Sequence, residues 1–436
     1  MLSIDFKSQF SKQIFILWFI LATLALAFSG IYSFFPYLFR TPFFGSNAQN
    51  LFNLSLMVHV NLGVLVWFLS STSMLMNLII KESLLSFSFI AFLSSMAGTI
   101  FIIISPFIGE SEPVKNDYIP ILHNFVFILG ISLFLSGVLL QVILALLSYL
   151  KANKNLLNFT ILISAIIFII SCVCLIQAAS QLRILTQERF VDLLEYYQLL
   201  FWGTGHVLQF NYVQLIIIAW LIIANPKPSL SLYLYQWINL VLIIPSIMVY
   251  WFYQIDSYEL YNFFTLHMKY IGGILLLIMA IKCFLSISRN ILDFRILSFY
   301  SSIFLILSGG TIGYLIDGAN VTIPAHYHGV ILGITVGLMG LFYLLLPKLG
   351  FRKVNEKYAK MQIMLYTLGQ FIHITALAIS GGYGVLRKDP EATLSAKAKI
   401  FMGAMGIGGS IALIGGVLFV VLIFKSLIVN NEKQTN

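Results

Sequence analysis

The sequence predicts an all-α integral membrane protein, a single domain of about twelve transmembrane helices over residues 1–436. The composition is the first observation: 60% of the residues are hydrophobic and only 9% are charged, whereas about a quarter of the residues in a soluble domain are charged. The second is the recurrence of apolar stretches of about 20 residues, the length of helix that crosses a bilayer. The third is the placement of the charges, which lie in the short breaks between these stretches.

The apolar stretches define the expected spans. The breaks between them are polar or rich in proline, as in Asn225-Pro226-Lys227-Pro228, and none is long enough to hold a soluble domain. The first stretch is too long for the core of a signal peptide and lacks a small-residue cleavage site, so we retain it as a span. The spans are expected near 13–35, 52–80, 84–107, 120–149, 156–179, 197–223, 230–253, 262–286, 296–316, 324–347, 361–380 and 400–426.

The charged residues predict the topology and exclude some partners. Lysines and arginines fall in breaks on one side of the predicted bundle, and the segment with Glu110, Glu112 and Asp117 falls on the other. Because loops rich in lysine and arginine stay in the cytoplasm, both termini are expected there. The net charge of +9 is spread between the spans and forms no single patch, so nucleic acid is not an expected partner. The three cysteines lie in apolar stretches without zinc-type spacing.

Histidines mark the candidate site. Ionisable side chains in the bilayer are costly and usually have a function, and imidazole is an ordinary ligand of heme iron. A single such histidine is equally well explained by a hydrogen bond to a neighbouring helix, so the interpretation depends on the pattern. All seven lie within or at the ends of predicted spans: His59, His123, His206, His267, His326, His328 and His373.

Two histidines open the tenth span, at His326 and His328. Residues two apart on a helix point about 200° away from each other, so these side chains suit two cofactors on opposite flanks better than one shared metal ion. A heme with two histidine ligands needs its second ligand from another helix, and His59 in the second span is the candidate. Gly63 and Gly329 lie close to these histidines, where a missing side chain would leave room for a macrocycle.

The positions of these histidines resemble those in subunit I of the heme-copper oxidases. The segment His326-Tyr327-His328, followed by a Gly-rich apolar stretch, is similar to the tenth helix of that family. There the first histidine binds the high-spin, oxygen-reactive heme and the second binds the low-spin heme, whose other ligand comes from the second helix, where His59 stands. The segment Trp202-Gly203-Thr204-Gly205-His206 in the sixth span is similar to the W-x-x-G-H segment whose histidine ligates copper.

The resemblance implies an enzyme. Electrons would pass from a cytochrome c-like donor through a low-spin heme on His59 and His328 to a high-spin heme on His326, where oxygen is reduced to water. His326 and His206 are then the expected catalytic residues. Arg387 and Lys388 lie in an outer segment where family members use arginines to pair with heme propionates. Other membrane oxidase subunits and the lipid bilayer are the implied partners, and the inner (plasma) membrane of a bacterium is the implied location.

Copper is left open, because the sequence departs from the family at the copper site. The seventh span ends in Val249 to Asp256 without the two adjacent histidines of the family, and His267 lies too far along, in the eighth span. Many oxidases also have a tyrosine crosslinked to the sixth-helix histidine, four residues after it, but this position is Phe210. Since one imidazole is a poor copper site, His206 is either a copper ligand or a hydrogen-bond donor beside a five-coordinate heme.

Other functions remain open. Nitric oxide reductases use related hemes without the crosslinked tyrosine, but they normally keep the seventh-helix histidines and nearby glutamates that this chain lacks. A degenerate relative that binds heme for electron transfer or gas sensing agrees with the missing histidines. A transporter has the right number of spans, but no internal repeat is visible. No Asp or Glu lies in the middle of a span, and Lys282 is better explained by snorkelling, so proton pumping is not predicted.

Overall fold

The computed structural model describes residues 4, 6–40, 49–287, 293–387 and 395–428. Twelve helical segments in these ranges are long and apolar enough to cross a membrane, which confirms the predicted all-α bundle. Their bounds are Gln9–Phe34, Leu51–Met76, Glu82–Phe107, Phe125–Tyr149, Leu156–Glu188, Leu193–Ala224, Leu230–Phe252, Tyr258–Ser286, Phe294–Tyr314, Thr322–Lys348, Glu356–Gly382 and Ala396–Ile428.

Three of the spans are interrupted. The second consists of α2 (Gln49–Val60), the π-helical turn η1 (Asn61–Val66) and α3 (Trp67–Met76), and the eighth consists of α10 (Tyr258–His267), the π-helical turn η4 (Met268–Gly272) and α11 (Gly273–Ser286). The seventh is divided into α8 (Leu230–Ile243) and α9 (Pro245–Phe252), because a proline lacks the N–H that a continuous helix needs. Both π-helical turns follow closely after a histidine, and such turns occur frequently at functional sites.

The helices group into two compact units. The first comprises Met1–Ser29, Met57–Ile218 and Pro226–Lys282, and the second comprises Gly30–Leu56, Ala219–Asn225 and Cys283–Asn436. In the first unit α4 packs along α5, and α6 contacts α5, α8 and α9. The assignment of residues 1–436 to a single domain stays a prediction. The remaining spans of this part are α1 (Gln9–Arg40), α4 (Leu85–Ile104), α5 (Phe125–Tyr149), α6 (Leu156–Glu188) and α7 (Leu193–Ala224).

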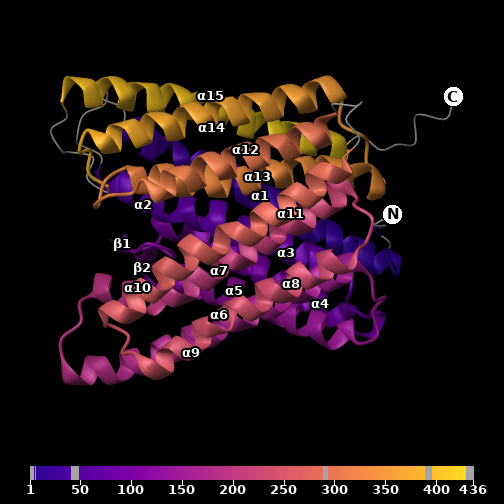
Figure 1. Cartoon of the computed structure of the whole chain (residues 1–436), viewed down its shortest axis with the longest axis horizontal. Coiled ribbons are helices and arrows are strands. Elements are labelled where there is room, and N and C mark those ends of the chain that lie inside the picture. Colours follow the sequence, from indigo (N-terminus) through magenta and orange to yellow (C-terminus); the bar gives the residue numbers. More distant parts are fainter. Residues whose placement is uncertain (1–3, 5, 41–48, 288–292, 388–394, 429–436) are drawn as a thin grey trace. The chain divides into compact units, whose positions relative to one another are not determined.

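The second unit is built mainly from the last four helices, drawn in orange to yellow in Figure 1. Helix α12 packs along α13, α14 packs along α15, and α13 contacts α14. The segment after α14 pairs with the segment before α13: the N–H of Val321 donates to the carbonyl of Val385 at 3.0 Å, and the N–H of Arg387 donates to that of Ala319 at 3.1 Å. The bounds are α12 (Phe294–Tyr314), α13 (Thr322–Lys348), α14 (Glu356–Gly382) and α15 (Ala396–Ile428).

A short hairpin precedes the fourth span. Strands β1 (Glu112–Val114) and β2 (Ile121–His123) pair antiparallel, and the helix predicted from residue 120 begins only at Phe125. The side chain of Asn124 caps this helix by accepting the Phe127 N–H at 2.7 Å. His123 therefore lies on a strand outside the helix, and the loop between the two strands carries Tyr118.

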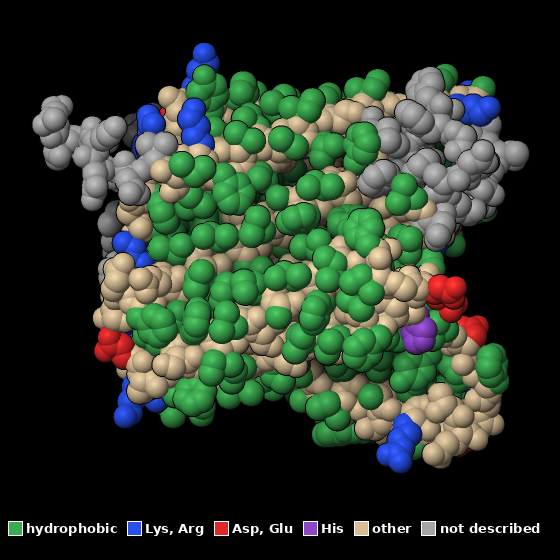
Figure 2. Space-filling model, turned by 180° about the vertical axis from the view of Figure 1, so that it is seen from behind, with side chains coloured by type: hydrophobic (Ala, Val, Ile, Leu, Met, Phe, Trp, Pro, Cys, Tyr) green, Lys and Arg blue, Asp and Glu red, His purple; other side chains and the backbone are tan. Residues whose placement is uncertain are grey.

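The outer surface of the helices is apolar. Figure 2 shows one face covered by hydrophobic side chains, with charged side chains mainly near its margins. Large apolar side chains are exposed within the spans, such as Ile281 in α11 (57%) and Ile407 and Ile414 in α15 (64% and 60%). Lipid is the solvent that such helix faces require, so the chain is an integral membrane protein.

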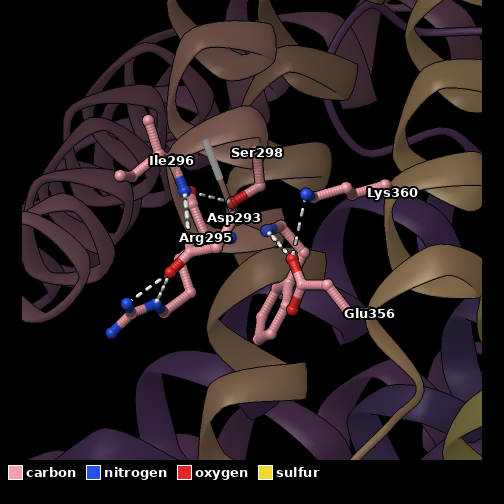
Figure 3. Close-up of polar contacts among 7 residues, drawn as sticks. Asp293, Arg295, Ile296, Ser298, Glu356 and Lys360 are labelled. Carbon is pink, nitrogen blue, oxygen red and sulfur yellow. Dashed lines mark hydrogen bonds and ion pairs between the residues drawn. The ribbon is translucent and has the colours of Figure 1, made fainter. Parts of the chain in front are cut away.

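A polar cluster holds the first turn of α12, as Figure 3 shows. The Asp293 side chain accepts two backbone N–H bonds of that turn, at 2.9 and 3.1 Å, and pairs with the Arg295 guanidinium. Glu356, the first residue of α14, accepts the Phe294 N–H at 2.8 Å and lies 3.5 Å from the Lys360 ammonium. Burial by itself raises the pKa of Asp293, but the bonds from Arg295 and the backbone outweigh it and hold this pKa below its usual value.

The substitution Asp293→Asn keeps a capping oxygen and removes the charge. Because the pKa of Asp293 is lower in the folded state, the charge contributes stability that is complete above the unfolded pKa of about 3.9 and is lost as the pH falls through the folded pKa. We expect the wild type to be more stable by at most about 1 kcal/mol at neutral pH and this difference to disappear in acid. Thermal unfolding in detergent across this pH range measures it. A difference that does not change with pH would contradict the prediction.

Candidate functional site

His59 lies in the last turn of α2, and its imidazole is anchored on α1. Nδ1 lies 2.9 Å from the carbonyl oxygen of Ser29 and 3.1 Å from the Ser29 hydroxyl, which donates to the His59 carbonyl at 3.0 Å. Since a carbonyl only accepts, the ring proton is on Nδ1 and the lone pair is on Nε2. A hydrogen bond of this kind on the nitrogen opposite the metal orients most ligating histidines.

His326 and His328, at the start of α13, have the same kind of hydrogen bond at Nδ1. Nδ1 of His326 donates to the Gly309 carbonyl on α12 at 2.8 Å, and Nδ1 of His328 donates at 2.7 Å to the carbonyl one turn earlier in its own helix. The two rings diverge as predicted from their spacing. That of His326 reaches α12, whereas that of His328 stacks on Tyr327 (4.8 Å) and faces His373 on α14 (5.2 Å between ring centroids).

Arg387 lies beside this segment. The backbone pairing before α13 brings its guanidinium carbon to 5.9 Å from the centre of the Tyr327 ring. It therefore places a cation beside Tyr327, the residue between His326 and His328, and its role toward a heme propionate stays a prediction. Lys388, the other residue predicted to pair with propionates, lies outside the described residues.

The interpretation of Gly63 and Gly329 as room for a macrocycle is wrong. A Cβ atom on Gly63 would lie 2.4 Å from the Ser29 hydroxyl, and one on Gly329 would lie 2.5 Å from the Cα atom of Gly309. At each glycine, atoms of a neighbouring helix occupy the space that a side chain would need. A small residue lets two transmembrane helices approach closely. The sequence showed that space is needed there but not which part of the protein fills it.

His206 in α7 is held at both ring nitrogens. Nδ1 donates to the Trp202 carbonyl at 2.8 Å, so Nε2 carries the lone pair and accepts from the Tyr118 hydroxyl at 2.9 Å. The rings of Trp202 and Tyr118 both lie 4.7 Å from the imidazole, and that of Phe264 lies at 5.5 Å. Tyr118 is a site residue that the sequence did not reveal, because it lies in the hairpin loop, 88 residues before His206.

The surroundings of His206 do not fit a copper ion. Copper sites use several imidazole or sulfur ligands, and the described ranges contain no group of three His, Cys, Asp or Glu side chains able to hold a metal. His267 has the opposite tautomer: its Nε2 donates to the Leu242 carbonyl at 2.7 Å, and its Nδ1 is buried without a partner. Its ring packs between Phe263 and Phe210. No copper chemistry is therefore derived for this site.

Two further histidines complete the set. Nδ1 of His373 lies 3.1 Å from the Met405 carbonyl, so the anchor prepares an imidazole for a metal without by itself identifying a ligand. Nδ1 of His123 lies 3.3 Å from the Tyr197 hydroxyl on an exposed part of the hairpin. Neither was predicted to be a ligand.

An open cleft of about 500 Å³ in the first unit borders the site. Trp202 forms part of its wall, and the Tyr261 ring stacks on Trp202 at 4.4 Å. The Trp202 ring thus contacts both the cleft and the His206 imidazole, which lies 4.7 Å away. The other lining residues are Asp256, Ser257, Tyr258, Asn262 and Thr265.

Known proteins resemble this chain over most of its length. The family model for cytochrome c and quinol oxidase polypeptide I matches residues 13–418. The chain belongs to this family. Membership confirms the resemblance to subunit I and indicates an oxidoreductase in general, and members of this family bind hemes. An uncharacterized protein of Rickettsia prowazekii (strain Madrid E) is 34% identical over 94% of this chain and 95% of its own length. One of Aquifex aeolicus (strain VF5) is 28% identical over 79% and 87%, respectively.

Gly313 in α12 makes room for His326. A Cβ atom there would lie 2.5 Å from Nδ1 of that ring, whereas one on Gly310, one turn away, would meet no atom within 4 Å. We expect Gly313→Ala to displace the imidazole and lower the stability by about 1–3 kcal/mol. The control Gly310→Ala should be neutral or stabilising by up to about 1 kcal/mol. Unfolding of both variants in detergent tests this, and equal stabilities would show that Gly313 does not hold the ring.

Proposed function

We propose that the protein is the heme-bearing subunit I of a respiratory terminal oxidase, which passes electrons from a cytochrome c-like donor to a site where oxygen is reduced to water. One observation supports the proposal: His59, His326 and His328, the residues that the sequence resemblance assigns as heme ligands, each have Nδ1 hydrogen-bonded to a backbone carbonyl. An imidazole so held offers Nε2 to iron in a fixed orientation. Membership of the family supports the same conclusion.

The roles of the residues follow from their motif positions. His59 and His328 are proposed as the two ligands of the low-spin heme and His326 as the ligand of the high-spin heme. Iron so bound supplies one-electron redox chemistry, with a potential set by its ligands and their hydrogen bonds. Arg387 offers a guanidinium to a propionate carboxylate, and Lys388 is proposed for the same role from the sequence. The charge bias supports an orientation with both termini in the cytoplasm of a bacterial cell.

The surroundings of His206 favour a second candidate function. Tyr118 occupies Nε2 of this histidine, the side on which a metal or a substrate would otherwise be met. This contact supports a heme protein that transfers electrons or senses a gas while a partner subunit carries the chemistry. Nitric oxide reduction has less support, because no glutamate lies in the middle of a span. Heme and copper quantitation together with oxygen consumption separates these functions.

Substitution of the ligand histidines by alanine tests the proposal. His59→Ala and His328→Ala should each remove the low-spin heme spectrum, because iron cannot stay six-coordinate with one ligand lost. His326→Ala should remove carbon monoxide binding to the reduced protein and leave the low-spin spectrum. His123→Ala, on the exposed hairpin, is the control and should retain both signals. Reduced-minus-oxidised spectra measure this. A purified wild-type protein without heme, or ligand variants with unchanged spectra, would refute the assignment.

A further inference from the structure

The turn between α13 and α14, in the second unit, gathers positive charge. Residues 348–360 contain five of the 25 lysines and arginines of the chain: Lys348, Arg352, Lys353, Lys357 and Lys360. Among the described residues only Lys360 of this group has a carboxylate within reach, that of Glu356 at 3.5 Å. The other four side chains are all exposed, and we call them the basic loop. The charge bias predicts that this loop faces the cytoplasm.

The backbone of this turn is fixed at both ends. Gly350 follows α13 with a φ of 87°, and the N–H of Phe351 donates to the Leu346 carbonyl at 3.0 Å. This bond closes a Schellman motif, in which glycine is favoured because of its positive φ. Asn355 then caps α14 by accepting the Lys357 N–H at 3.0 Å. The cations are therefore presented on an ordered turn, and a ligand does not have to order it.

The carboxylates beside the basic loop are engaged elsewhere, as Figure 3 shows. Asp293 pairs with Arg295 and caps the first turn of α12. Glu356 accepts the Phe294 N–H at 2.8 Å and pairs with Lys360. In the part of the chain that the structure describes, no ion pair joins a carboxylate to a cation of the basic loop. Like charges this close in the sequence repel one another, so an anion from outside the chain would stabilise them.

Membrane topology alone does not require this density of charge. The break between α5 and α6 lies on the same side by the number of spans, and it carries two cations, Lys151 and Lys154. Lys154 donates to the Tyr149 carbonyl at 2.8 Å. The basic loop contains twice as many cations as this break, which indicates a use beyond topology.

An apolar stripe on α14 continues from the basic loop. Its members Tyr358, Met361, Met364 and Leu368 are 48%, 41%, 51% and 53% exposed. Their spacing of three or four residues puts them on one face of the helix. Apolar faces of this kind on a transmembrane helix contact lipid chains. A turn rich in cations is thus followed directly by a lipid-facing surface on the same helix.

We propose that the basic loop and this stripe together bind an anionic phospholipid of the cytoplasmic leaflet. The phosphate pairs with the cations of the loop, among which Arg352 offers two parallel N–H donors. The acyl chains lie along the stripe of α14. An acidic segment of another protein would meet the loop and leave the stripe unused, whereas a phospholipid satisfies both. Clusters of about four to eight cations beside a transmembrane helix are typical of anionic lipid recognition.

Lipid titration followed by native mass spectrometry in a neutral detergent tests the charged part of the site, without heme or turnover. Phosphatidylglycerol is the anionic probe and phosphatidylcholine is its zwitterionic counterpart. We expect the wild type to bind phosphatidylglycerol at least about tenfold more tightly than phosphatidylcholine. Arg352→Gln combined with Lys353→Gln should weaken phosphatidylglycerol binding by about 25-fold, since each cation near an anionic lipid contributes about fivefold.

The matched control is Lys151→Gln combined with Lys154→Gln, which removes the same charge from the break between α5 and α6. This variant should keep the wild-type affinity. Equal affinities of the wild type for the two lipids, or an equal loss of affinity in both double variants, would overturn the proposal. Displacement of phosphatidylglycerol by an equal concentration of inorganic phosphate would also overturn it, because the loop would then be a site for a free anion.

Photolabelling of the wild type locates the acyl chains and needs no variant. The protein is placed in phosphatidylcholine nanodiscs with a trace of phosphatidylglycerol that carries a diazirine on an acyl chain, and mass spectrometry finds the labelled peptides. We expect residues 358–368 to be labelled several-fold more than α11, where Ile274 and Ile281 are equally exposed at 56% and 57%. Excess unlabelled phosphatidylglycerol should remove this difference. Equal labelling of α11 and α14 would show ordinary lipid contact and refute the site.

Discussion

The low polarity of the bilayer interior governs where every polar atom of this chain can lie. In hydrocarbon a backbone or side-chain polar group must find its partner within the protein, since no bulk water is available. Helices satisfy this requirement for the backbone, which explains twelve helical segments with exposed apolar side chains such as Ile281 and Ile407. Side chains must satisfy it one at a time. The histidines and the buried amides Gln141 and Gln214 satisfy it in different ways.

The histidines solve it by binding to backbone carbonyls. Such a bond lowers the free-energy cost of placing each ring in the membrane. It also determines which ring nitrogen carries the proton. At His59, His326 and His328 the proton is on Nδ1, so the orientation that stabilises the fold is also the one that a heme ligand needs. At His206 the same hydrogen bond at Nδ1 is present, but Nε2 accepts from the Tyr118 hydroxyl. The same hydrogen bond at Nδ1 is thus combined with two different environments of Nε2 in this chain.

Aromatic rings and a hydroxyl group surround His206. Tyr250 stands near the end of the seventh span, where the family has histidines, and its hydroxyl reaches α7 beside Gly203. Tyr118 enters from a loop, and Phe210 packs on His267. In the second unit, His326 and His328 each donate from Nδ1 to a backbone carbonyl, which leaves the lone pair on Nε2.

The sequence alone determined the number of spans, the family and the divergence of His326 and His328, because hydropathy and a rotation of about 100° per residue are local properties of a helix. It could not determine which nitrogen of each imidazole is protonated, that Tyr118 meets His206, or that Gly63 and Gly329 serve helix contacts. Each of these depends on the side chain that a distant segment presents. Thr204, Asn211 and Gln214 recur at helical spacing in the sequence. Only packing against α6 and α8 decided which of their atoms are paired, because hydrogen bonds between helices depend on tertiary structure.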